Sequence, residues 1–149
     1  MKLEEEIKQS KFENERQKAI LNVIYTANWI GSVQHKIFKK HKLTSPQYNV
    51  LRILRGKFPD PLTVSSIQER MLDKMSNASR LVDKLVEKGW AERSICMYDR
   101  RQVDVVITTA GQKLLKDIEP ELLSFHNDEM VLTEEDAAAV NKALDKIRG

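Results

Sequence analysis

An acid and two adjacent arginines, Asp99, Arg100 and Arg101, lie between two stretches that have the residue pattern of β-strands. The stretch "WAERSIC" alternates in polarity and the stretch "VDVVIT" is β-branched, so together they predict a hairpin with the charges at its tip. An extended guanidinium fits the narrow, negative minor groove of A·T-rich DNA, and a carboxylate two residues before an arginine can hold it in position. The alternative is a solvated ion pair in a turn, which explains one arginine but not the second.

A second group of polar residues lies at the start of a helix predicted within "DKMSNASRLVDKLVEKGW", which Gly89 would cap. One face of this helix is apolar: Met75, Ala78, Leu81, Val82 and Leu85. The other side carries short polar and basic residues: Lys74, Ser76, Asn77, Ser79 and Arg80. Such a helix can enter the major groove, where Asn pairs with adenine and Arg with guanine, while Lys84 and Lys88 could reach phosphates. An ordinary surface helix is the alternative.

No other group of side chains indicates catalysis or metal binding. His35, His41 and His126 lack metal-ligand spacing, and no catalytic constellation or phosphate-binding loop is recognisable, so we expect no enzyme, no metal and no other cofactor. The single cysteine, Cys96, excludes an intrachain disulfide and fits a reducing compartment. Because Cys96 falls in the predicted hairpin, a thiol-based redox sensor is an alternative function, although a structural role is favoured.

The charges are distributed unevenly along the 149 residues, whose net charge is +3. Between Lys36 and Arg101 there are 15 Lys/Arg and 7 Asp/Glu, whereas the two flanks together carry 10 basic and 15 acidic residues. A basic middle suggests contact with a polyanion. No apolar run approaches the ~20 residues of a membrane-spanning helix and the N-terminus is polar, so a cytoplasmic protein of one domain is expected.

Two helices are predicted in the first third of the chain. Apolar residues recur at spacings of three and four from about Glu13 to Lys40, which predicts one long amphipathic helix. A shorter helix follows, because Thr44 and Gln47 have the spacing of a capping box and Pro46 falls in the first turn.

The remaining segments complete a mostly α chain with a small antiparallel β-sheet. Residues 62–64 can form a brief strand, and Ser65 with Gln68 predicts a second capping box that opens a short helix. That helix and the polar-faced helix after it form a candidate helix-turn-helix. After the hairpin the helical period returns at Thr108, and a last helix is capped by Thr133.

The segment from Ser79 to Leu115 resembles the core signature of the MarR (multiple antibiotic resistance regulator) family. In that family a helix ends in a Lys-Gly turn, a wing carries Asp-x-Arg, and a strand closes on Leu/Ile-Thr-x-x-Gly. This chain supplies Lys88-Gly89, Asp99-Arg100-Arg101 and Ile107-Thr108-Thr109-Ala110-Gly111. The resemblance is close from about Leu43 to Leu115, and extends to the terminal helices by their length and order.

The resemblance implies a homodimeric winged helix-turn-helix transcriptional regulator, a repressor bound to a pseudo-palindromic operator in double-stranded DNA. The residues in its base-reading helix are Ser76, Asn77 and Arg80. In its wing, Arg101 enters the minor groove, Asp99 orients it and Arg100 contacts a phosphate. The implied organisation is a single domain, 1–149, with a DNA-binding lobe at 43–107 and a helical dimerisation lobe formed by 12–42 and 108–149.

The resemblance also implies two further surfaces. The dimer interface would bury Ile20, Val23, Ile24, Leu122, Leu132, Val140, Leu144 and Ile147. A small aromatic or lipophilic anion is the expected effector, and a candidate pocket consists of Tyr25, Trp29, His35 and Tyr48. The alternative from another class is a winged-helix module whose basic face binds an acidic protein partner.

Overall fold

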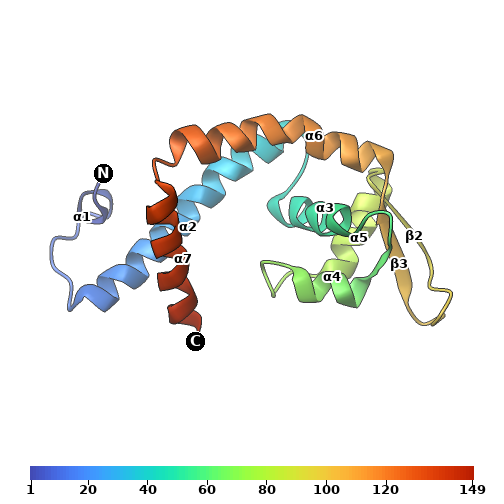
Figure 1. Cartoon of the computed structure of the whole chain (residues 1–149), viewed down its shortest axis with the longest axis horizontal. Coiled ribbons are helices and arrows are strands. Elements are labelled where there is room, and N and C mark those ends of the chain that lie inside the picture. The colour runs from blue at the N-terminus through green and yellow to red at the C-terminus, as the bar shows by residue number, and fades with distance from the viewer.

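The computed structural model describes all 149 residues, and helices dominate it (Figure 1). The helices are α1 (Leu3–Glu6), α2 (Glu15–Lys40), α3 (Ser45–Lys57), α4 (Val64–Arg70), α5 (Ala78–Glu87), α6 (Thr109–Ser124), the π-helical turn η1 (Phe125–Glu129) and α7 (Glu134–Arg148). The strands are β1 (Leu62–Thr63), β2 (Ala91–Ile95) and β3 (Val103–Ile107). The predicted class, mostly α with a small antiparallel sheet, is therefore confirmed.

The three strands form one antiparallel sheet in the order β1-β3-β2. β3 is central because it pairs with both other strands, and its Val105 and Ile107 are buried at 0% and 2% exposure, while β2 has only Ala91 buried. The hairpin of β2 and β3 extends away from helices α3, α4 and α5 at one end of the molecule (Figure 1).

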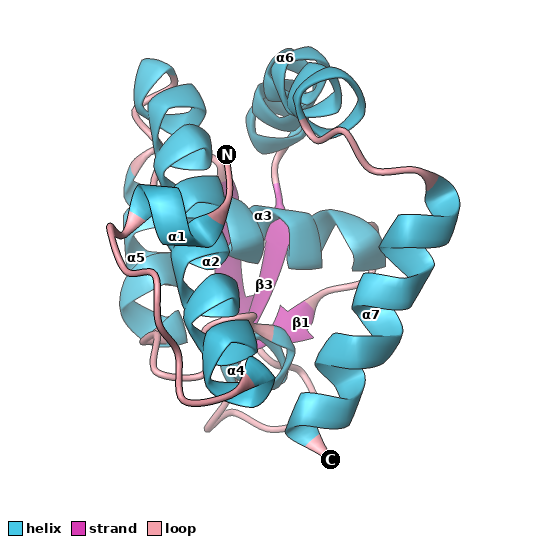
Figure 2. Cartoon of the chain, turned by 90° about the vertical axis from the view of Figure 1, so that its left-hand side faces the viewer, coloured by secondary structure: helices cyan, strands magenta, loops and turns pink.

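Helices α2 and α6 run alongside each other and connect this lobe to the opposite end of the molecule, where both termini lie (Figure 1). One continuous core of 19 buried side chains extends from α2 through the lobe to Phe125. α7 contributes no buried residue to it and stands apart from α1 and α2 when viewed from that end (Figure 2). No helix combines the length and the apolar character that crossing a bilayer requires.

Most of the helices have an Asn or Thr as their N-cap. The side-chain oxygen of this residue accepts a hydrogen bond from one of the otherwise unpaired backbone N–H groups of the first turn. Thr44 and Gln47 form the predicted capping box of α3, and Thr133 caps α7 as predicted. The predicted start of α4 is wrong: its N-cap is Thr63, whose Oγ1 accepts from Ser66 N at 3.2 Å, and not Ser65. Gln68 is therefore free to bond elsewhere.

Candidate nucleic-acid interface

The turn between α4 and α5 is held by side chains from neighbouring helices. Asn49 on α3 accepts a hydrogen bond from Leu72 N at 2.9 Å. Gln68 on α4 accepts from Ala78 N at 3.0 Å, and Asp73 accepts from Met75 N at 2.9 Å. These bonds fix the relative position of the two helices, as a helix-turn-helix requires.

The second helix of this helix-turn-helix, α5, is shorter than the sequence predicts. It starts at Ala78, and Asn77 is its N-cap, accepting from Arg80 N at 3.0 Å. Lys74 and Ser76 therefore lie in the preceding turn, and Met75, at 93% exposure, is not part of the apolar face. The reason is that Asp73 and Asn77 bond to nearby backbone amides, which favours turns and caps over a helix interior.

The outer face of α5 carries exposed polar and charged side chains that belong to Ser79, Arg80, Asp83, Lys84 and Glu87. Arg80 has no carboxylate partner, whereas Lys84 pairs with Glu87 at 3.1 Å. Asp83 forms an ion pair with Arg93 of β2, so the hairpin lies directly beside the face of α5 that carries these residues.

Lys88 forms contacts within the chain that the sequence did not predict. Its Nζ donates hydrogen bonds to the carbonyl oxygen of Lys42 and, at 3.4 Å, to Gln47 Oε1. The same ammonium lies 4.8 Å from the centroid of the Trp90 ring. Lys88 therefore joins the end of α5 to α3, and this role is structural.

The tip of the hairpin presents Arg100 and Arg101 to solvent, with no ion pair at either guanidinium. Contrary to the prediction, Asp99 does not hold the Arg101 side chain; its Oδ1 accepts from the backbone N of Arg101 at 2.9 Å. A short carboxylate in a turn bonds most easily to the amide two residues on. Cys96 lies at the base of the tip and is 8% exposed.

Most residues expected at a dimer interface are exposed in the single chain. Their exposed fractions are 54% for Ile20, 40% for Val23, 53% for Ile24, 48% for Leu132, 43% for Val140 and 60% for Ile147. Leu144 is partly buried. Leu122 departs from the prediction, because it is only 5% exposed and belongs to the chain's own core.

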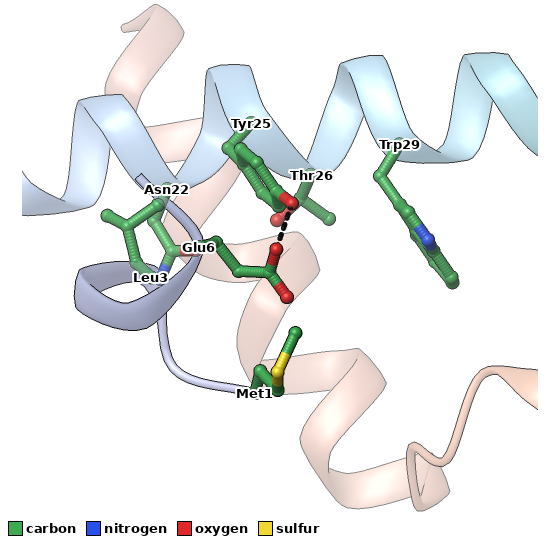
Figure 3. A pocket seen from close by; sticks show the side chains of 7 residues that line it. All are labelled: Met1, Leu3, Glu6, Asn22, Tyr25, Thr26 and Trp29. Carbon is green, nitrogen blue, oxygen red and sulfur yellow. Dashed lines mark hydrogen bonds between the residues drawn. The ribbon is translucent and has the colours of Figure 1, made fainter. Parts of the chain in front are cut away.

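The four residues proposed for an effector pocket do not come together. Tyr25 and Trp29 line one cavity of about 270 Å³ at the N-terminal end of α2 (Figure 3). His35 is exposed further along α2, and the Tyr48 ring stacks on Phe38 with centroids 4.5 Å apart. The cavity also contains Glu6 from α1, a helix that sequence patterns did not reveal.

A second cavity of about 360 Å³ lies where α2 meets α6 and η1, and is lined by Val33, Lys36, Ile37, Lys40, Glu121, Ser124 and Glu129. Lys40 donates a hydrogen bond to Glu121 at 2.5 Å, and this bond lowers the pKa of the Glu121 carboxyl. His41 Nε2 lies 3.9 Å from the same carboxylate. Lys36 has no carboxylate partner.

The chain has a helix-turn-helix whose second helix presents polar residues to solvent, and a two-stranded hairpin with a basic tip lies beside it. These features define the class of winged helix-turn-helix DNA-binding proteins. Comparison with known proteins agrees. The profile described as "MarR family" matches residues 43–103. The HTH-type transcriptional regulator YfiV of Bacillus subtilis is 31% identical over 122 residues, which cover 81% of this chain and 74% of YfiV.

Solved structures give the same result. A MarR transcription factor from Planctomyces limnophilus is 30% identical with a TM-score of 0.69, covering 93% of this chain and 98% of that one. A mutant of MarR from E. coli, complexed with operator DNA, has a TM-score of 0.75 at 23% identity and covers 93% and 99% of the two chains. The chain belongs to the MarR family, and it is a DNA-binding transcriptional regulator. The relatives are described as transcriptional regulators.

Proposed function

We propose that the chain acts in the cytoplasm as a homodimeric, non-catalytic repressor of a pseudo-palindromic operator, and that a small molecule releases it. Ligand-responsive repression is typical of the family. The observation that carries the proposal is a set of three exposed arginines, one on the outer face of α5 and two at the hairpin tip. Arg80, Arg100 and Arg101 are exposed there and none of them is in an ion pair.

In this proposal α5 enters the major groove with Ser79 and Arg80, and Arg101 enters the minor groove. Asn77 keeps only its amide donor for a base, because its oxygen caps α5. Lys84 and Arg100 contact phosphates, and the turn residues Lys74 and Ser76 reach the backbone or the groove edge beside the start of the helix. The E. coli MarR structure with operator DNA supports the mode of binding.

The exposed apolar residues of α2 and α7 support the homodimer. An isolated chain would leave Ile24 and Ile147 more than half exposed, and burying them against a second copy removes apolar area from water. A two-fold dimer also places two copies of α5 about 34 Å apart, one turn of B-DNA, which matches two half-sites.

The cavity between α2 and α6 is the better of the two cavities for a small aromatic or lipophilic anion. Val33 and Ile37 supply apolar contacts, and Lys36, which is in no ion pair, supplies positive charge beside Glu129 and the Lys40–Glu121 pair. The cavity lies where the helical part of the chain meets the lobe that carries α5. A ligand that favours one arrangement of these parts would shift the population of dimers that fit DNA.

The proposal is tested by fluorescence anisotropy with a duplex that carries the region upstream of the chain's own gene, over a salt series. We expect two chains per duplex, a preference over scrambled DNA, and a loss of about tenfold, about 1.4 kcal/mol, for Arg101→Ala. Arg16→Ala removes the same charge from the exposed N-terminal end of α2 and should have little effect. Binding that ignores sequence, or equal losses in both variants, would refute the proposal.

A further inference from the structure

The cavity at the N-terminal end of α2 is formed by two elements that are distant from the DNA-binding lobe. It is lined by Met1, Leu3, Glu6, Asn22, Tyr25, Thr26 and Trp29 (Figure 3). The volume of about 270 Å³ lies just below the range of about 300–1,000 Å³ for drug-sized ligand sites, so only a small molecule would fit. Nothing in the DNA-binding function accounts for this cavity.

α1 is held against α2 by specific contacts. Leu3 is 6% exposed, Glu4 forms an ion pair with Lys18, and the Tyr25 hydroxyl donates a hydrogen bond to Glu6 Oε2 at 2.6 Å. A four-residue helix is not stable alone, so these contacts keep it in place. Glu6 thus extends from α1 toward Tyr25 and is held in the cavity wall (Figure 3).

The charge of the lining side chains is negative. Glu6 is the only acidic side chain there, and no lysine, arginine or histidine lines the cavity. Lys18 forms its ion pair with Glu4 of α1. Neither Lys18 nor the amino group of Met1 forms an ion pair with Glu6. The hydrogen bond to Glu6 raises the pKa of Tyr25, so the phenol keeps its proton at neutral pH.

The lining therefore combines one carboxylate that forms no ion pair, two aromatic rings, two apolar side chains and the polar Asn22 and Thr26. Aromatic faces and a carboxylate are the groups that bind ammonium ions carrying apolar substituents. We propose that this cavity binds a small organic cation, a quaternary ammonium or protonated amine with an aromatic or aliphatic body. The aromatic rings of Tyr25 and Trp29 contact its apolar part, and Glu6 balances its charge.

The cavity lies on a different face of α2 from three of the residues proposed for the dimer interface. Asn22, Tyr25, Thr26 and Trp29 follow the spacing of one helix face, and at 100° per residue that face lies roughly opposite the face with Ile20, Val23 and Ile24. The inference does not depend on DNA binding, because it rests on the contacts between α1 and α2 alone. The two proposed sites therefore differ in the charge of their ligands: a cation binds between α1 and α2, and an anion binds at the junction of α2 and α6.

The test is isothermal titration of the full chain, tagged at its C-terminus, with benzyltrimethylammonium, its neutral carbon isostere neopentylbenzene, and benzoate. We expect the ammonium ion to bind with a millimolar or lower Kd and the other two to bind at least about tenfold more weakly. Glu6→Gln should weaken binding of the cation about tenfold while keeping an acceptor for Tyr25. Trp29→Leu should also weaken it.

Glu5→Gln is the matched control, because Glu5 lies on the same short helix, is exposed and does not line the cavity. It removes the same charge and keeps the oxygen that accepts from Lys2 N. Equal losses in Glu6→Gln and Glu5→Gln, equal affinity for the three probes, or no binding of the ammonium ion would overturn the inference. No DNA is present, so this outcome is independent of the proposed repressor function.

Discussion

Replacing Gly111 by alanine should destabilise the chain, because the first turn of α6 packs directly on the backbone of Trp90. A Cβ at Gly111 would lie 2.3 Å from the Trp90 carbonyl oxygen and 2.8 Å from Ile107 Cγ1. The first of these atoms is backbone and cannot rotate away, so α6 and the strand end must separate by about 1 Å, as in an overpacked core.

The magnitude follows from three terms. Overpacking costs about 1–3 kcal/mol. The bond from Thr108 N to the Trp90 carbonyl, 3.1 Å long, weakens as the elements separate, for about 1 kcal/mol. Alanine gains up to about 1 kcal/mol over glycine in a helix. We expect a net loss of about 2 kcal/mol in the free energy of unfolding.

The assay is urea denaturation followed by far-UV circular dichroism at a fixed protein concentration, since dimerisation makes the midpoint concentration-dependent. Gly56→Ala on α3 is the control, because a Cβ there meets no atom within 4 Å. That variant should be neutral or stabilised by up to about 1 kcal/mol. The reasoning fails if Gly111→Ala is as stable as Gly56→Ala.

Two further predictions concern charged side chains. Lys84→Ala should reduce the slope of log K against log salt by about 1, whereas Lys88→Ala should leave the slope unchanged and lower the urea midpoint, because the Lys88 ammonium is bound to the carbonyl of Lys42. Glu121 has a pKa lowered in the folded chain by the hydrogen bond from Lys40, so its stabilising effect is present above the pKa of the unfolded chain and is lost on acidification. The difference in urea midpoint between the wild type and Glu121→Gln should therefore shrink as the pH falls below about 5.

Features set by neighbouring residues in the chain were predictable from the sequence. The capping box of Thr44 and Gln47 and the β2–β3 hairpin depend on residue types within a few positions, and both are present. The charged tip was also predictable, but the partner of Asp99 was not. Two acceptable hydrogen-bond donors, a guanidinium and a backbone amide, compete for the same carboxylate, and the geometry of the turn decides between them.

Features set by contacts between distant segments were not predictable. The helical pattern of "DKMSNASRLVDK" permits a start before Lys74, and the actual start at Ala78 is fixed by the Asn77 cap together with Gln68 of α4, which accepts a hydrogen bond from Ala78 N. The docking of α1 depends on Lys18 and Tyr25, which lie 14 and 19 residues from their partners. Apolar periodicity placed Leu122 correctly on a buried face of a helix but could not say whether its partner is the same chain or a second copy.

The residues that carry the family resemblance meet at one point in the structure, which explains their spacing. Gly89 takes a left-handed φ of 77° after α5, and its carbonyl accepts the Thr108 hydroxyl at 2.7 Å. The same hydroxyl caps α6 by accepting from Gly111 N at 3.1 Å. The end of α5, the end of β3 and the start of α6 are therefore joined through Thr108. Under the proposed function, a ligand at the α2–α6 junction would act on α6, which Thr108 joins to both α5 and the hairpin.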